Sequence, residues 1–221
     1  MQESPIDLQP EYLQTVFNAV GESLEGRRDE LNRLDEFNHD HGDHMVEVFH
    51  LAAQAAGDGE LNALADSMKR ASALLSARVE NGSAQVYARG LSLLGEQFRQ
   101  RQIELDDLLL VVQQYMSNQK GEEQDESGRS SEVSKALLNA LAEWEKLEDS
   151  QADGAAGKAG GLDMGYLFGV GMAYLQAKQK GGDRLDVLSE TVVSASPLGK
   201  LPHRHASGVI AVRALLEALK G

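Results

Sequence analysis

The chain has 221 residues, 42% of them hydrophobic, a formal net charge of −14 and no cysteine. This length suits one domain with a substantial core. The acidic charge excludes non-specific binding to nucleic acid or to an anionic membrane surface, because both require a basic surface. The absence of cysteine excludes disulfides and thiolate metal sites. Carboxylates can still bind phosphates through Mg²⁺, so a phosphate-bearing ligand remains open.

The composition predicts an all-α protein. Aromatic residues make up 5% of the chain and only four prolines occur, whereas sheets favour aromatic and β-branched side chains. The first ten residues contain no basic and apolar leader, and no apolar run approaches the roughly 20 residues of a membrane span. We therefore expect a cytoplasmic protein that does not bind membranes.

Apolar side chains recur at helical spacing along most of the sequence. The expected helices cover residues 12–34, 45–57, 61–79, 86–98, 105–116, 133–147, 162–174, 185–192 and 210–219. Ser83, Asp183 and Ser207 are the expected helix caps, and residues 118–131 and 149–161 are expected to be flexible loops. Glycines within residues 162–174 indicate close contact with another helix. The sequence thus predicts one domain over residues 1–221, a closed helical bundle of about eight helices.

A polar segment, LDEFNHDHGDHM, interrupts this pattern at residues 34–45 and contains three of the six histidines. We expect it to form a loop between two helices. Imidazole and carboxylate groups are ligands for divalent ions, and a loop allows several of them to converge. Polar loops of acidic proteins also contain such residues without binding an ion, so both interpretations stay open.

Two further segments are candidates for an anion site. Residues 81–84, NGSA, precede a helix whose first N–H groups would attract phosphate, although an ordinary connection between helices would have the same sequence. Residues 198–208 contain four basic or imidazole side chains that could bind an anion or simply remain solvated: Lys200, His203, Arg204 and His205.

In this order, the three segments resemble the nucleotide-binding L subunit of dihydroxyacetone kinases (DhaL) and the related domain of bacterial fatty acid kinase. Residues 34–45 resemble the motif LD...GDxDHGxNM, with Asp40-His41-Gly42 matching outright. Residues 82–91, GSAQVYARGL, resemble the motif GxSGxLYGxxF, including Tyr87. Residues 194–199 and Ser207-Gly208 resemble the motif that precedes the last helix.

The resemblance implies a helical barrel whose loops at one end hold Mg²⁺ and an adenine nucleotide, ADP or ATP. It places the metal on Asp35, Asn38 and Asp40. Asp43, His39 or His44 could substitute as ligands, and a histidine-rich shell would favour Mn²⁺ or Zn²⁺ over Mg²⁺. It places the nucleotide on His41, Gly42, His44, Met45, Gly82 and Ser83.

We therefore expect a DhaL-like, metal-dependent nucleotide-binding domain that transfers a phosphoryl group to a substrate held on a separate subunit. Such catalysis depends on positioning and charge neutralisation rather than on a nucleophile. Two alternatives stay open. The first is a relative that kept the fold as a binding or regulatory subunit, and the second is a metal-dependent phosphohydrolase built on His39, His41, His44 and Asp40. A homodimer is compatible with each.

Overall fold

The computed structural model describes residues 10–57, 64–78, 80–117, 128–153 and 164–220. These residues form helices and contain no strand, which confirms the all-α prediction. The elements are α1 (Pro10–Glu25), α2 (Arg28–Leu34), α3 (His41–Gly57), α4 (Leu64–Ser76), α5 (Gly82–Arg101), α6 (Leu105–Ser117), α7 (Gly128–Asp153), α8 (Met164–Lys180), α9 (Arg184–Ser194), the 3₁₀ turn η1 (Pro197–Lys200) and α10 (Pro202–Lys220).

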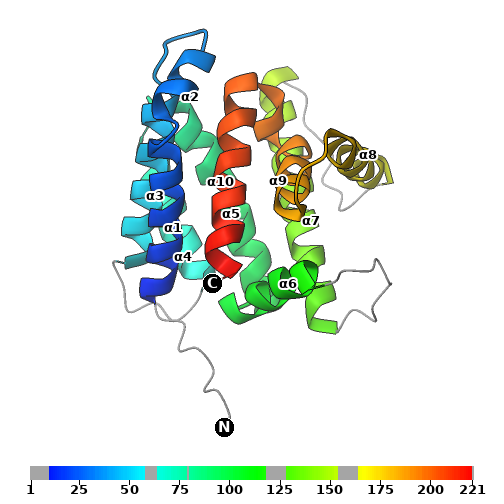
Figure 1. Cartoon of the computed structure of the whole chain (residues 1–221). Helices are drawn as coiled ribbons and strands as arrows, with labels where there is room; N and C mark the ends of the chain where they lie inside the picture. Colours follow the sequence, from blue (N-terminus) through cyan, green and yellow to red (C-terminus); the bar gives the residue numbers. More distant parts are fainter. Residues whose placement is uncertain (1–9, 58–63, 79, 118–127, 154–163, 221) are drawn as a thin grey trace.

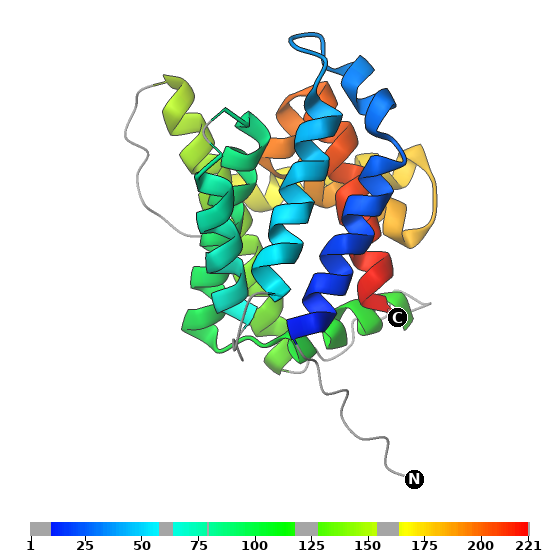
Figure 2. The same ribbon diagram turned by 90° about the vertical axis from the view of Figure 1, so that its left-hand side faces the viewer.

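The helices pack in a curved row in the order α7, α5, α4, α3, α1, α10, α9 and α8. The turn η1 contacts both α7 and α10, so the row curls back on itself. Helices α1, α3 and α10 run side by side in both views of the molecule (Figures 1 and 2). Helix α6 crosses one end of the bundle, and the link between α2 and α3 lies at the opposite end.

The interior is made by the apolar face of each helix. Val16, Val20 and Leu24 of α1 are at most 2% exposed and lie on one side of that helix because they recur at helical spacing. Close packing continues between α5 and α7, where a methyl group added at Gly90 would lie 2.9 Å from the Trp144 ring. No described helix has both the length and the apolar character needed to cross a membrane.

Several boundaries differ from the sequence prediction. The first expected helix is broken between α1 and α2, at Gly26 and Arg27. The predicted histidine-rich loop is wrong beyond Asp40, because α3 already begins at His41. The last helix begins at Pro202, so Ser207 lies within it and is not its cap. The predicted cap at Asp183 is confirmed, since it forms a capping box with Asp186.

The two predicted flexible loops fall mostly outside the described residues. Helix α7 includes residues 128–131 at its start and residues 149–153 at its end, so these parts are helical. Residues 118–127 and 154–161 lie outside the described part of the chain, as do residues 61–63 of the expected third helix.

Candidate functional site

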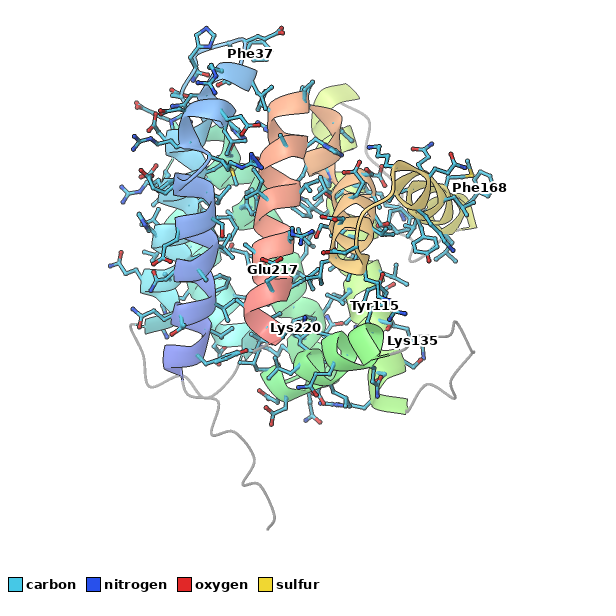
Figure 3. The ribbon with its side chains drawn as sticks, viewed as in Figure 1. Phe37, Tyr115, Lys135, Phe168, Glu217 and Lys220 are labelled. Carbon is cyan, nitrogen blue, oxygen red and sulfur yellow. The ribbon has the colours of Figure 1, made fainter. Side chains whose placement is uncertain are left out.

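The link between α2 and α3 buries one carboxylate and exposes the residues after it. Asp35 is 3% exposed, and its Oδ1 accepts a hydrogen bond of 3.1 Å from the backbone N–H of Phe37. Phe37 is 80% exposed at this end of the bundle (Figure 3). Burial raises the pKa of Asp35, but the N–H of Phe37 and the nearby His203 together lower it below its ordinary value. Asp35 is therefore a buried and ionised group.

His41, the first residue of α3, connects the starts of α5 and α10. Its Nε2 lies 2.8 Å from Oγ of Ser207, and its Nδ1 lies 3.2 Å from Oγ of Ser83. The Ser207 hydroxyl donates to the backbone oxygen of Arg204 (3.1 Å), so it accepts from Nε2–H of His41. The Ser83 hydroxyl then donates to Nδ1. We assign the Nε2–H tautomer to His41 from this pattern of partners.

The surroundings keep the His41 ring neutral. Burial and the neighbouring His203 lower the pKa of His41 to about 4, and the opposing effect of Asp35 is smaller. The two imidazole rings meet edge to face with their centroids 4.6 Å apart. Burial also lowers the pKa of His203, whose Nδ1 lies 3.9 Å from Oδ1 of Asp35. At neutral pH His41 therefore orients Ser83 and Ser207 by hydrogen bonds, and His203 packs against its ring, without either ring carrying a charge.

A side chain of α2 caps the start of α3. Oδ1 of Asn32 accepts hydrogen bonds from the backbone N–H of Gly42 (2.6 Å) and of Asp43 (3.3 Å). The two helices approach so closely that a methyl group added at Gly42 would lie 2.3 Å from the backbone oxygen of Arg28. Two of the first N–H groups of α3 are thus already used within the protein.

The start of α5 is capped by Asn81 rather than by the predicted Ser83. Oδ1 of Asn81 accepts from the N–H of Ala84 (2.8 Å), and its Nδ2 donates to the backbone oxygen of His44 (3.2 Å). Beside this cap, a methyl group added at Gly82 would lie 3.5 Å from Nη2 of Arg204. A guanidinium from α10 therefore lies next to the first turn of α5.

One buried hydroxyl lies within electrostatic reach of this guanidinium. The Tyr87 Oη, one turn further along α5, is buried and makes no hydrogen bond to any described residue. Burial raises the pKa of Tyr87, and Arg204 opposes that rise. The phenol is therefore protonated and can donate a hydrogen bond.

The predicted metal ligands do not converge. Asp43 accepts a hydrogen bond from Nδ2 of Asn32 (2.9 Å), and Oδ1 of Asp40 lies 3.2 Å from Nδ1 of His44 without hydrogen-bond geometry. Asn38 and His39 are exposed, and Asp35 faces His203. Among the described residues, no three His, Asp or Glu side chains are arranged to hold a metal ion. This arrangement does not fit the Mg²⁺ site that the DhaL resemblance implies.

Of the predicted nucleotide-binding residues, His41 and Ser83 lie in direct contact and Gly82 lies beside Arg204. His44 is partly exposed on the first turn of α3. Met45 is 0% exposed and belongs to the core. The starts of α3, α5 and α10 are therefore brought together.

Sequence reasoning missed the roles of Asn32, Asn81 and Ser207. The position of Asn81 directly before Gly-Ser was a usable signal, because asparagine is a preferred helix cap. Asn32 caps a helix that begins nine residues later, and no local pattern indicates that. In the basic segment, His203 and Arg204 lie at the site, whereas Nε2 of His205 lies 3.2 Å from Oε1 of Glu190.

Comparison with family models, with curated proteins and with solved structures finds no match to this chain.

Proposed function

We propose that the starts of α5 and α10 bind the phosphate groups of an adenine nucleotide, in a DhaL-like domain that serves phosphoryl transfer to a substrate on a separate subunit. The observation that carries this proposal is the Arg204 guanidinium beside Gly82 at the first turn of α5. A guanidinium and the N–H groups of a helix start both favour an anion, and their proximity favours one more strongly.

The phosphates are assigned to α5 rather than to α3. Asn81 takes the N–H of Ala84, while the N–H groups of Gly82 and Ser83 have no acceptor within the helix. Gly82 is exposed and has no side chain, so a phosphate can approach its backbone. On α3, Asn32 already takes the corresponding N–H groups.

Neutral His41 has a positioning role in this proposal. Its hydrogen bonds to Ser83 and Ser207 fix the start of α5 against the start of α10. The N–H groups of α5 and the guanidinium of Arg204 then keep a constant separation, which is the preorganisation that charge stabilisation requires.

A nucleotide normally brings Mg²⁺ bound to its own phosphates. The carboxylates of Asp35, Asp40 and Asp43 have separate partners, so no step is assigned to a metal held by this chain. The chain's own contribution is to bind and orient the phosphates, and the acceptor group belongs to the partner subunit.

Isothermal titration with ADP and with ATP, each in Mg²⁺, in Mn²⁺ and in EDTA, tests the proposal. We expect saturable binding that Arg204→Gln weakens by about tenfold or more, because a hydrogen bond to a charged group contributes about 1.5–3 kcal/mol. Arg33→Gln is the matched control, since Arg33 is an exposed arginine of α2. No binding at millimolar nucleotide under any of these conditions contradicts the proposal.

The carboxylates of Asp35, Asp40 and Asp43 do not converge on one point. This favours a second candidate, a DhaL-like binding or regulatory subunit without transferase activity. This candidate predicts that Asp40→Ala leaves partner binding unchanged and that nucleotide affinity is the same in Mg²⁺ and in EDTA. Phosphoryl transfer from bound ATP to a substrate on a partner chain would favour the kinase. Metal-dependent turnover of phosphoesters without a partner chain would instead favour the phosphohydrolase.

A further inference from the structure

Helix α8 is the last helix of the curved row, and α9 is its close neighbour (Figure 1). Its inner face consists of Tyr166, Ala173 and Ala177, which recur at helical spacing. The two alanines are 9% and 2% exposed, and Tyr166 donates a hydrogen bond of 3.3 Å to the backbone oxygen of Ala195. Small side chains therefore attach α8 to the bundle, and most of its large ones point elsewhere.

The outer face of α8 is apolar and exposed. Phe168 is 71% exposed and Leu175 is 51% exposed, and Phe168 points away from the bundle (Figure 3). Leu167, Met172 and Tyr174 are each about 40% exposed on the same helix. Of the nine large apolar side chains exposed in the described residues, five thus lie on α8. Such a concentration marks a contact surface rather than scattered apolar exposure.

The chain's own neighbouring segments are too poor in apolar residues to cover this face. Residues 154–163, directly before α8, contain one large apolar residue, Leu162, and residues 118–127 contain none. The starts of α1 and α4, to which residues 1–9 and 58–63 connect, lie across the bundle from α8 (Figure 1). The segments next to α8 therefore supply little apolar surface for this face.

We propose that this outer face, formed by Leu167, Phe168, Gly171, Met172 and Leu175, is the interface of a two-fold symmetric dimer of this chain. Together with Tyr174 beside them, the four large apolar side chains of this face expose roughly 450 Å². Two copies bring together roughly 900 Å² before the surrounding surface is counted, and that surface has to raise the buried area above the ~1,000 Å² lower limit of a specific interface. In a two-fold dimer the same patch serves both partners, so no second surface is required.

Charge also favours a second copy at this position. The chain carries a net charge of −14, so two copies repel each other over most of their surfaces. Residues 164–177 contain no charged side chain, although a quarter of the whole chain is charged. Two copies that meet through α8 therefore bring no carboxylates of this stretch together.

The glycine within the outer face fits a close helix contact. A methyl group added at Gly171 would meet nothing within 4 Å in the single chain. Glycine inside an exposed helix costs roughly 0.5–1 kcal/mol relative to alanine. At this position its benefit is that the backbone of a facing helix can approach closely.

The molar mass of the full chain in solution tests the dimer. Light scattering and sedimentation over the micromolar range should give twice the chain mass of 23.9 kDa. Phe168→Glu should weaken the dimer at least tenfold, because it removes a central aromatic anchor and introduces two facing charges. Phe37→Glu, at an 80% exposed phenylalanine away from α8, is the matched control and should leave the mass unchanged.

Single cysteines provide a second measurement that does not depend on Phe168. The chain has no cysteine, so Phe168→Cys, Gly171→Cys and Met172→Cys each introduce one thiol. Under a mild oxidant, at least one should form a disulfide-linked dimer, because this requires Cα atoms within about 7 Å. Phe37→Cys should not. The proposal is overturned if the wild type is a monomer at every concentration, even one that binds phospholipid vesicles. It is also overturned if a dimer forms that none of these variants weakens or crosslinks.

Discussion

Around His41, polar side chains are buried and paired, whereas along α8 large apolar side chains are exposed. The His41 imidazole has a serine hydroxyl on each ring nitrogen, and Ser83 and Ser207 are 4% and 1% exposed. Burying such groups costs free energy unless they are hydrogen-bonded, so pairing fixes one arrangement of the helix starts. On α8 the large apolar side chains are exposed to solvent, and burying them requires a partner. We propose a small ligand for the first region and association with a second copy for the second.

The largest effect should come from breaking the buried pairing. His41→Ala leaves the Ser83 hydroxyl without its acceptor and opens a cavity between α3, α5 and α10. We expect it to lower the free energy of unfolding by about 4 kcal/mol, measured by urea denaturation. His50→Ala, an exposed position on the same helix, should change it by less than about 0.5 kcal/mol. A loss below about 1 kcal/mol at His41 would show that the pairing does not hold these helices.

The pairing should also make stability depend on pH. The folded pKa of His41, about 4, lies below its ordinary 6.5, so between these values the unfolded chain binds a proton that the folded chain does not. The contribution is complete above about pH 6.5 and is lost as the pH falls to about 4, by roughly 3 kcal/mol. His203, whose pKa is also lowered, acts in the same direction.

Urea titrations between about pH 7 and about pH 4 measure this dependence. His41→Ala should remove most of the slope, and His50→Ala should keep it. If the free energy of unfolding of the wild type stayed constant over this interval, the buried His41 ring would accept a proton without penalty. Burial and pairing would then not distinguish this region from the exposed face of α8.

Periodicity predicted most helices, because apolar faces recur every three to four residues. It missed the starts of α3 and α10, since their first turns, His41 to His44 and Pro202 to His205, are polar. Those turns are helical because their side chains find distant partners, such as Ser207 for His41. The sequence also did not show which residues the carboxylates would contact. Asp40 and Asp43 are close neighbours in the chain, yet Asp40 faces His44 and Asp43 faces Asn32 and Arg28.

The glycines of α8 show the same limit. The sequence indicated close helix contact, but Gly169 and Gly171 face open space in the single chain. A glycine in the sequence shows that the backbone carries no side chain at that position. Only the three-dimensional arrangement shows whether another helix packs against it. The expected close helix contact is therefore not made within the single chain at these two positions.

Two glycine substitutions compare the regions directly, with the smallest expected effects and opposite signs. Gly42→Ala places a methyl group 2.3 Å from the backbone oxygen of Arg28 and should destabilise the protein by about 2 kcal/mol, because α2 and α3 must separate. Gly169→Ala meets nothing within 4 Å and should stabilise it by about 0.5–1 kcal/mol through helix propensity. Thermal and urea denaturation measure both. If both substitutions stabilised the protein, the α2–α3 contact would be loose, and the preorganisation of the neighbouring helix starts would have no basis.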